Sequence, residues 1–418
     1  MRLAACGIDF GTSNSTAAVP TPSGPRLVPL EDGKATLPSA VFFNLDEEHQ
    51  RYGRAALAEY LEGYEGRLMR SMKSLLGSGL MEAGTEIGGR LLPFRTLIGD
   101  FIGQIKQRTE RDCDHALDAV VVGRPVRFVD EDDAADQLAQ DTLEQIVRGL
   151  GFREVSFQFE PIAAAHAYEQ GITREELVLI VDIGGGTSDF SLVRLSPERR
   201  SAADRTRDLL GNTGVHIGGT DFDKRLSLVN VMPELGMGSP LKNGAPIPSN
   251  VYFLLATWHT INQTYQGKVW AGFQEIARNV ADPRRFDRLL NVIRKQAGHQ
   301  LAMQVEAAKI ELSLAEQSML ALDEAEAGLV ITLHKGDFEG AIASEITRIG
   351  QAAHACLAQA GVSAERIDTL FFTGGSSAVP ALRAALAQQF PAARAVEGDL
   401  YGSVGCGLAV VAGQRYGC

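Results

Sequence analysis

The chain has 418 residues, 45% of them hydrophobic, and it carries a formal net charge of -12. A single hydrophobic core stops growing at roughly 250 to 300 residues, so two or more domains are expected. The negative charge disfavours nucleic acid and anionic membranes as partners, because an acidic surface repels both. A small anionic ligand remains compatible with this charge, since a few backbone amides and one lysine can bind it locally.

The cysteines and the hydropathy indicate a cytoplasmic, soluble protein. The cysteines form an odd set with no C-x-x-C pair and no Cys/His cluster at metal-binding spacing: Cys6, Cys113, Cys356, Cys406 and Cys418. Such a set is typical of a reducing compartment. No apolar run approaches the roughly 18 residues of a membrane-spanning helix, so we expect no membrane segment.

The first elements along the chain are predicted to form a hairpin. Residues 3–8 have the composition of a short buried strand, and the polar residues 12–15 lead into a second apolar stretch at 16–19. The same pattern returns with a strand at 177–181, a glycine turn at 184–187 and a strand at 190–195. An internal duplication accounts for both copies.

Each copy is followed later by a further strand and a helix. Residues 119–122 precede an acidic helix that begins near Asp132, and residues 369–372 precede a helix that follows Pro380. Strands mixed with helices in two similar halves predict an α/β protein with a cleft between the halves. The acidic run at 130–136 is interpreted as a solvated helix start that suits the helix dipole, in preference to a metal site.

Two stretches between the strand blocks have their own character. Residues 286–314 carry apolar side chains close to the helical period, which predicts one long amphipathic helix. Residues 233–250 are rich in proline and glycine and are expected to form an ordered but irregular connection.

The turns that follow the first strand of each copy carry the candidate chemistry. They are Asp9-Phe10-Gly11-Thr12-Ser13-Asn14 and Asp182-Ile183-Gly184-Gly185-Gly186-Thr187-Ser188-Asp189. Glycine permits close backbone approach, successive amides form an anion-binding nest, and the hydroxyl groups add donors. The aspartate can hold Mg²⁺ through water, because this ion keeps several of its own waters.

A single turn of this kind would also fit an ordinary hairpin, whereas two related copies indicate a phosphate site. The other common nucleotide-binding motifs are missing, because the chain has neither a GxxxxGK[ST] loop nor a strand-helix GxGxxG fingerprint. The sequence therefore predicts that two related turns grip the phosphates of a nucleotide from opposite sides of a cleft.

These residues resemble a known family. The set is similar to the nucleotide-binding domain of DnaK-type heat-shock chaperones, and most closely to short, chaperone-related proteins of the bacterial YegD type. The segments that carry the resemblance occur in family order: 7–13, Glu160-Pro161 with the following alanines, 182–189, 218–223 and 373–376. The family belongs to the actin, hexokinase and heat-shock ATPase superfamily.

The resemblance implies an α/β, two-lobed actin-like ATPase fold. In this fold, two duplicated ribonuclease H-like domains, each with an inserted helical or mixed subdomain, surround a nucleotide cleft. The expected first lobe comprises residues 1–171 and 395–418, with an insertion at about 39–115. The expected second lobe comprises residues 172–394, with an insertion at about 217–325.

The resemblance also implies roles for individual residues. Asp9 and Asp182 would hold Mg²⁺ through water, Lys73 would contact the γ-phosphate and the attacking water, Thr187 would lie near the γ-phosphate, and Glu160 would sense the nucleotide from the cleft floor. The residues expected to bind ATP or ADP are Gly11, Thr12, Ser13, Asn14, Gly184, Gly185, Gly186, Gly218, Gly219, Glu306, Lys309, Ser313, Gly374, Gly375, Ser376 and Asp399.

Several of these assignments keep an alternative. Lys73 also fits a surface lysine on an amphipathic helix, and Glu306 with Lys309 also fits a solvated ion pair. Glu306, Lys309 and Ser313 share one helix face, which would let all three reach one ligand. Pro125 falls at the family's switch proline, or it forms only a rigid turn.

The chain departs from the family pattern at the adenine side. Ile310 and Ala378 stand where the family usually has arginines, one of which stacks on adenine, so weaker ATP binding is expected. Thr220 replaces an acidic residue, and Arg127 is only a weak match for the family's basic switch residue. After residues 408–412, neither an acidic-leucine linker nor a peptide-binding β-sandwich is expected before Cys418.

These observations predict a chaperone-like ATP-binding protein with slow, Mg²⁺-dependent hydrolysis that drives lobe closure toward an unknown protein partner. The first alternative is a nucleotide-dependent scaffold or actin-like polymer with weak or no ATPase activity. The second is a small-molecule kinase of the same superfamily, which would need an acceptor pocket and a base. No sequence feature indicates such an acceptor pocket or such a base.

Overall fold

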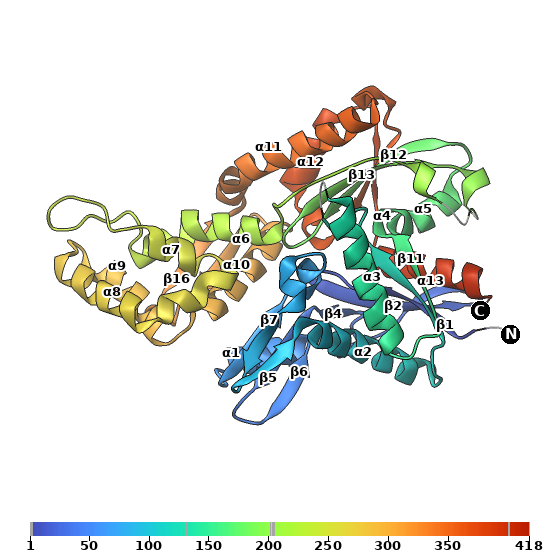
Figure 1. The fold of residues 1–418 in the computed structure, drawn as a ribbon. Coiled ribbons are helices and arrows are strands. Elements are labelled where there is room, and N and C mark those ends of the chain that lie inside the picture. The colour runs from blue at the N-terminus through green and yellow to red at the C-terminus, as the bar shows by residue number, and fades with distance from the viewer. Residues whose placement is uncertain (1–2, 130–131, 201, 203–204, 400–401, 418) are drawn as a thin grey trace.

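The computed structural model describes residues 3–129, 132–200, 202, 205–399 and 402–417. Two mixed sheets form the centre, and from each half an arm extends to the left in Figure 1. Within the described residues no helix is long and apolar enough to cross a membrane.

The first sheet has the strand order β11-β10-β1-β2-β3, with β4 paired to β2. Its strands are β1 (Ala5–Asp9), β2 (Asn14–Thr21), β3 (Gly24–Leu27), β4 (Thr36–Pro38), β10 (Ala119–Arg124) and β11 (Glu154–Phe159). The predicted hairpin is confirmed, because β1 and β2 pair antiparallel with Asp9 opposite Thr16. The predicted strand at 119–122 is also confirmed as β10, which pairs parallel with β1.

Alternating side chains of this sheet form two cores. On one face, Ile8 and Val120 pack with α2 (Phe94–Cys113) and α3 (Asp133–Gly149) through Phe101 and Leu143. On the other face, Ala5 and Val121 pack against α13 (Ser403–Tyr416). The acidic helix start is confirmed from Asp132 onward, because Asp132 caps α3 and accepts the Ala135 N–H at 2.9 Å, while Asp130 and Glu131 of the predicted run lie outside the described residues.

The second sheet repeats the topology of the first, with the order β18-β17-β12-β13-β14. Its strands are β12 (Glu176–Ile183), β13 (Ser188–Leu195), β14 (Leu209–Val215), β17 (Thr369–Thr373) and β18 (Arg394–Glu397). As in the first sheet, an antiparallel hairpin is extended by parallel strands on one side and an antiparallel strand on the other. The predicted internal duplication is confirmed by this matched strand order.

Helices cover both faces of the second sheet. Leu179 and Val181 belong to a large core shared with α6 (Gly219–Leu226), α11 (Lys335–Ala360) and α12 (Pro380–Gln389), and the last of these confirms the helix predicted after Pro380. Val178 and Ile180 on the opposite face pack with Ile162 of α4 (Glu160–Ala164). The helix α5 (His166–Gly171) follows α4 and leads from the first sheet into the second.

Each half carries an arm between its sheet strands. The first arm contains β5 (Ala40–Asn44), β6 (His49–Tyr52), α1 (Arg54–Leu61), β7 (Gly66–Arg70), the 3-10 helices η1 (Met72–Leu75) and η2 (Gly79–Glu82), β8 (Gly84–Ile87) and β9 (Arg90–Pro93). The second contains the π-helix η5 (Ser227–Val231), η6 (Met232–Leu235), α7 (Asn250–Leu255), η7 (Trp258–Tyr265), α8 (Gly267–Asn279), α9 (Pro283–Arg294), α10 (Gly298–Leu312), β15 (Gln317–Ala321) and β16 (Val330–His334). Short helices also connect the strands of the second sheet: η3 (Pro197–Arg199), η4 (Thr206–Asp208), η8 (Ala364–Arg366) and η9 (Gly375–Ala378).

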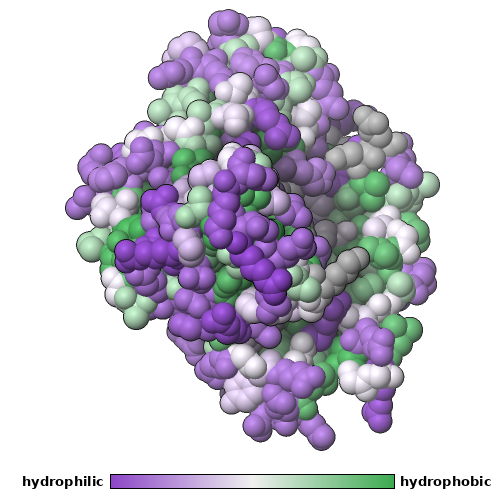
Figure 2. Space-filling model, turned by 90° about the vertical axis from the view of Figure 1, so that its left-hand side faces the viewer, coloured by the Kyte–Doolittle hydropathy of each residue, from purple (hydrophilic) through white to green (hydrophobic). Residues whose placement is uncertain are grey.

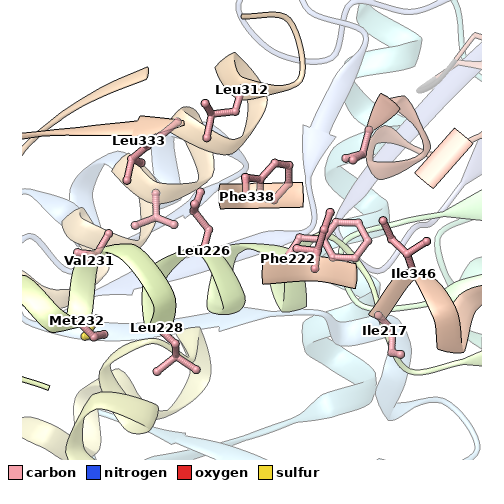
Figure 3. Close-up of a cluster of buried hydrophobic side chains, with 14 of the residues drawn as sticks. Ile217, Phe222, Leu226, Leu228, Val231, Met232, Leu312, Leu333, Phe338 and Ile346 are labelled. Carbon is pink, nitrogen blue, oxygen red and sulfur yellow. The ribbon is translucent and has the colours of Figure 1, made fainter. Parts of the chain in front are cut away.

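A continuous hydrophobic core anchors the second arm to the second sheet. Figure 3 shows Phe222 and Leu226 of α6 in one cluster with Leu312, Leu333 and Phe338. These side chains come from α6, α10, β16 and α11, so the arm is fixed at its base. The predicted irregular connection lies farther out on this arm, where the chain has no helix or strand between Leu235 and Asn250.

The single helix predicted over residues 286–314 is wrong. The chain forms two helices, α9 and α10, with a break at 295–297 where Gln296 has a positive φ of 53°. Leu290 and Ile293 of α9 and Leu301 and Val305 of α10 all enter one core, so the apolar period continues across the break. The Gly298 N–H donates to the Tyr265 hydroxyl oxygen at 2.9 Å, which fixes the start of α10.

The lobe boundaries expected at residues 171/172 and 394/395, with insertions at about 39–115 and 217–325, stay predictions. They fall next to elements that the structure describes, since α5 ends at Gly171 and β18 begins at Arg394.

Candidate functional site

The two glycine turns face each other at the ends of β1 and β12. A Cβ atom at Gly185 would lie 2.5 Å from the Ser13 hydroxyl oxygen, so the two turns approach as closely as glycine allows. Within the first turn, a Cβ atom at Gly11 would collide with the Asn14 carbonyl oxygen. Glycine is therefore required at Gly11, where the obstructing atom is backbone, whereas at Gly185 the Ser13 hydroxyl would have to move aside. The predicted approach of the two turns from opposite sides is present in the fold.

The second turn is held in place by the first residues of α6. The Gly184 N–H donates to the Thr187 carbonyl oxygen at 3.0 Å, which closes the turn. The Gly219 N–H donates to the Gly184 carbonyl oxygen at 3.0 Å, and the Thr220 N–H donates to that of Gly185 at 2.7 Å. These bonds bring Gly218 and Gly219 next to the second glycine turn, and their role in nucleotide binding stays a prediction.

Four ionisable side chains, those of Lys73, Glu160, Asp9 and Asp182, form a cluster beside the two glycine turns. Lys73 Nζ of η1 donates to Glu160 Oε1 at 2.5 Å, and the side chains are 11% and 15% exposed. Asp9 and Asp182 lie within electrostatic reach of both residues. The cluster thus joins the first arm, α4 and the ends of β1 and β12. The alternative of a surface lysine at Lys73 is wrong, because its ammonium group lies inside this cluster.

The pKa values of these groups record an excess of negative charge. Burial, reinforced by Glu160, raises the pKa of Asp9 to about 7, and Lys73 only partly offsets this. Burial and the charge of Asp189 raise the pKa of Asp182 to about 8. Burial favours a neutral amine at Lys73, but the surrounding carboxylates outweigh it and raise the pKa of this group. Three carboxyl groups therefore share one ammonium group.

This donor set fits Mg²⁺ held through water. Carboxylate oxygens are the ligands that Mg²⁺ prefers, and a cation would relieve the repulsion that raises the aspartate pKa values. In the described residues no three acidic, histidine or cysteine side chains are close enough to bind one metal ion directly. The residues present therefore suit an ion that keeps its own waters, with Asp9 and Asp182 on either side.

A second group of candidate residues gathers around α10. Lys309 Nζ lies 2.8 Å from Asp223 Oδ1 and donates to the Gly219 carbonyl oxygen at 3.3 Å. The hydroxyl oxygen of Ser376 occupies the space that a Cβ atom at Gly219 would need. Gly219, Lys309 and Ser376 thus lie together at the start of α6.

The remaining predicted site residues contact neighbours close to them in the fold. Thr187 Oγ1 donates to Asp189 Oδ2 at 2.9 Å, and Ser313 Oγ donates to the Lys309 carbonyl oxygen at 3.1 Å. Glu306 is exposed on α10. Thr12 and Gly186 lie in the facing turns, and Gly374 packs against the Asp182 carboxylate and the Ile183 carbonyl, with Gly375 next to it.

Asp399 has a structural partner that the sequence did not predict. Its Oδ1 atom accepts the Gly402 N–H at 3.1 Å, and its carbonyl oxygen accepts the Ser403 hydroxyl at 2.5 Å. The residue therefore supports the start of α13. A role at adenine stays a prediction for this position.

Two contacts near the candidate site were missed in the sequence. Asp223 is the partly buried partner of Lys309, and the Asp221-Phe222-Asp223 motif was a signal that could have found it. Burial raises the Asp223 pKa to about 6, although Lys309 opposes this. The second is Arg124, which donates to the carbonyl oxygens of Pro125 at 3.0 Å and of Val126 at 3.2 Å.

Arg124 gives the turn after β10 a physical anchor. Its guanidinium also bonds Asp136 at 2.8 Å and lies over the Phe159 ring, which precedes Glu160. Arg127, the weak match for a basic switch residue, is instead 2.8 Å from Asp133 at the surface. Whether Pro125 acts as a switch or as a rigid turn stays open.

Comparison with known proteins decides the family. The Hsp70 protein family matches residues 78–232 and 282–417, which together make up more than half of the chain. The chain belongs to the Hsp70 family. It therefore has the two-lobed actin-like ATPase fold, in agreement with its two sheets of matched strand order.

Individual relatives are chaperones from bacteria. The chain is 31% identical over 220 residues to "Chaperone protein DnaK" of Ureaplasma urealyticum serovar 10, which covers 52% of this chain and 33% of that protein. It is 31% identical over 265 residues to "Chaperone protein HscA homolog" of Pseudomonas aeruginosa strain LESB58, covering 58% of this chain and 40% of that protein. The matched region of this Hsp70 chain thus spans well under half the length of these relatives, and the finer resemblance to the YegD type stays a prediction.

Proposed function

We propose that this Hsp70-family chain binds ATP with Mg²⁺ between its two glycine turns and hydrolyses it slowly to ADP and phosphate. The observation that carries the proposal is the Lys73–Glu160 pair, which lies with Asp9 and Asp182 directly below the facing turns. This cluster combines an ammonium group for the terminal phosphate with carboxylates suited to a hydrated cation.

The protein's own groups have distinct parts in this chemistry. Backbone amides and hydroxyls of the two turns bind phosphate oxygens and orient the chain of phosphates. The Lys73 ammonium stabilises negative charge on the transferred phosphoryl group, while Glu160 holds that ammonium in position. The water oxygen forms a bond to the γ-phosphorus as the bond to the bridging oxygen of ADP breaks, and the water proton leaves with phosphate or solvent. Mg²⁺, when bound, neutralises phosphate charge.

The nucleoside would lie between α10 and η9. Glu306, Lys309 and Ser313 are on one face of α10, and Gly374 to Ser376 come from the opposite side. Lys309 is already tied to Asp223 and Gly219, so its proposed role is to fix α6 against α10 beside the ribose. The Lys309–Asp223 pair supports a nucleoside site to which α6 and α10 both contribute.

Nucleotide-dependent closure toward a protein partner follows from this arrangement. Ligand groups on β1 and β12 belong to different sheets, so a nucleotide contacts both halves at once. ATP and ADP would shift the balance between open and closed arrangements only through contacts that differ between them. The matching DnaK and HscA proteins are named chaperones, which favours a chaperone-related role here.

The test is nucleotide binding and phosphate release by the purified chain, measured beside Lys73→Ala and Asp182→Asn. Lys34→Ala is the matched control, because Lys34 is exposed in a turn away from the site. We expect phosphate release from the wild type and from the control, and a loss of about 100-fold or more in both site variants. A wild type that binds no ATP would refute the proposal, and active Lys73→Ala protein would refute the role of that lysine.

A further inference from the structure

The short turn that carries Lys73 begins with a residue in an uncommon backbone conformation. Ser71 has a φ of 55° and a ψ of 36°, which places it in the left-handed region. Residues with a side chain avoid this region, because their Cβ atom comes too close to the following carbonyl oxygen. Ser71 lies two residues before Lys73, so a strained residue directly precedes the 3-10 helix η1 that holds the ammonium group.

The left-handed residue turns the chain where β7 ends at Arg70. Met72, the next residue, is fully buried in the core of the first sheet, and Leu76 enters the same core. Lys73, between them, instead directs its ammonium group into the charged cluster. The core therefore holds Met72 and Leu76, and the backbone that starts at Ser71 decides the direction in which Lys73 leaves the turn.

Ser74 stabilises the conformation of Ser71. The Ser71 carbonyl oxygen accepts two hydrogen bonds from Ser74, one from its N–H at 3.1 Å and one from its hydroxyl at 2.7 Å. Together these bonds close a loop of four residues that contains Lys73. We call Ser71 and Ser74 the serine pair.

The serine pair lies at the surface rather than in a core. Both side chains are exposed. Figure 2, which views the molecule from the side of its arms, shows a mostly hydrophilic surface with smaller hydrophobic areas. The left-handed conformation therefore depends on hydrogen bonds within the turn, and a substitution of either serine changes the turn without leaving a cavity in the core.

The chain repeats the same hydrogen bonds once more, away from Lys73. The Ser78 hydroxyl donates to the Leu75 carbonyl oxygen at 2.7 Å, and the Ser78 N–H donates to the same oxygen at 3.1 Å. Leu75 has a negative φ, unlike Ser71. Ser78 thus offers a comparison with equal bonds but without the left-handed residue and without the lysine between the partners.

We propose that Ser71, held in the left-handed conformation by Ser74, is the residue that positions the Lys73 ammonium for phosphoryl transfer. This inference rests on the proposed ATP hydrolysis. The lysine side chain is a flexible four-carbon stem, so the direction of its Cα–Cβ bond limits where the ammonium group can be held. A misplacement of about 1 Å in a reacting group can slow a reaction by about 100-fold. A relaxed turn would therefore lower turnover while the glycine turns still bind nucleotide.

The first test compares two substitutions of similar size at Ser71. Valine is β-branched and strongly disfavours the left-handed region, whereas asparagine adopts it more readily than most residues. We expect single-turnover phosphate release to be about tenfold or more slower in Ser71→Val, and within about twofold of the wild type in Ser71→Asn. The Kd for ADP, which lacks the phosphate that Lys73 would contact, is measured by calorimetry and is expected to stay within about twofold in both variants.

The second test removes the hydroxyl of Ser74. Ser74→Ala loses one hydrogen bond and is expected to release phosphate about 3- to 10-fold more slowly. Ser74→Thr keeps a hydroxyl group and is expected to restore most of the rate. Ser78→Ala is the matched control, because it removes a hydrogen bond of the same length that does not enclose Lys73, and it is expected to match the wild type.

Chemical reactivity of Lys73 reports its position without any nucleotide. The side chain is 11% exposed and is paired with Glu160, so N-hydroxysuccinimidyl acetate should acetylate it slowly in the wild type. Mass spectrometry of the peptide that contains Lys73 is expected to show acetylation about threefold or more faster in Ser71→Val and Ser74→Ala, because a displaced ammonium group loses its partner. Ser71→Asn and Ser78→Ala are expected to react at the wild-type rate.

The outcomes are distinct. Wild-type turnover and wild-type acetylation in Ser71→Val overturn the role of the serine pair and leave the proposed function standing. Equal losses in Ser74→Ala and Ser78→Ala also overturn it, because the effect would then not depend on Lys73.

A wild type that hydrolyses no ATP overturns the proposed function. The acetylation rates then decide separately whether the serine pair holds Lys73: faster acetylation in Ser74→Ala than in Ser78→Ala supports this, and equal rates overturn it. If Ser71→Val does not fold, as judged by circular dichroism, the comparison of Ser74→Ala with Ser74→Thr and Ser78→Ala decides the proposal by the same two measurements.

Discussion

Lys73 and Glu160 form an ion pair of 2.5 Å between residues that are 87 positions apart. Lys73 comes from the base of the first arm and Glu160 from the first residue of α4, which leads from one sheet to the other. The pair therefore links an arm to the crossover between the halves. If the proposed function holds, its position beside both glycine turns makes it the point where phosphate chemistry and movement of the halves meet.

Neutralising Glu160 tests this link. Glu160→Gln keeps the size of the side chain but removes the charge that holds the Lys73 ammonium, so we expect phosphate release to slow by about tenfold or more. ATP affinity, measured by calorimetry, is expected to change much less. Glu154→Gln, at an exposed position on β11, is the control. Unchanged turnover in Glu160→Gln would remove this residue from the mechanism.

Restoring a guanidinium at the adenine side is expected to strengthen binding. Ile310 is 55% exposed on α10, on the helix that carries Glu306 and Lys309. An arginine there could stack on the base, which corresponds to about 1 kcal/mol, or a roughly fivefold lower Kd for ATP. Met319→Arg adds the same charge on the exposed side of β15 and is the control. Equal gains in both variants would show a general charge effect on ATP affinity.

A buried ion-pair group beside α5 is expected to dominate local stability. Arg205 bonds Glu169 at 2.7 Å and also pairs with Asp208, and all three residues are buried. Arg205→Met leaves the buried Glu169 carboxylate without its cation and leaves Asp208 with Arg199 alone, which costs about 3 to 5 kcal/mol. Thermal unfolding should show a much lower Tm than for Arg207→Met, which changes an exposed arginine. Similar Tm values for the two variants would show that the buried group is not required.

Helix α13 is packed too tightly against α4 to accept a side chain at Gly407. A Cβ atom there would collide with the Ala163 carbonyl oxygen, which is backbone and cannot move aside cheaply. We expect Gly407→Ala to destabilise the fold by about 3 kcal/mol, seen as a lower Tm. Gly272→Ala in α8, where a Cβ atom would meet no neighbour within 4 Å, should be neutral or slightly stabilising. A Gly407→Ala protein as stable as Gly272→Ala would contradict the close packing.

Because His299 is buried, we expect the folded protein to lose stability in mild acid. Burial lowers the pKa of His299 to about 4, and the Arg70 charge adds to this, while the Trp258 carbonyl opposes it. The Tyr60 hydroxyl also lies 3.1 Å from its Nδ1 atom. An unfolded histidine titrates near 6.5, so the unfolded state binds the proton first as the pH falls.

The sign follows from this order of protonation. Stability from the neutral imidazole is complete above about pH 6.5 and is lost as the pH falls toward 4. Between pH 7 and pH 5 the free energy of unfolding should decrease by about 2 kcal/mol more in the wild type than in His299→Asn. Denaturant titrations at both pH values measure this difference. Parallel pH profiles for the two proteins would show that His299 titrates normally in the fold.

The sequence by itself determined the local elements and the repeat. Short apolar runs separated by polar or glycine turns predicted the β1–β2 and β12–β13 hairpins, and the repetition of this pattern predicted the duplication, because apolar runs and turn chemistry are local properties. The same local reasoning joined α9 and α10 into one helix. It failed there because the apolar period continues through the break, while the positive φ of Gln296 depends on tertiary contacts around Gly298.

In the candidate site, too, the sequence predicted some features and only the tertiary structure decided the others. Motif order predicted Asp9, Lys73, Glu160 and Asp182 through a family resemblance, but only the folded chain brings η1, α4 and two sheets close enough to form one charged cluster. The Lys309–Asp223 pair and the Tyr60–His299 contact join residues far apart in sequence. No local pattern predicts such pairs, because which side chains meet is decided by how the sheets and arms pack, and that packing sums weak interactions over the whole chain.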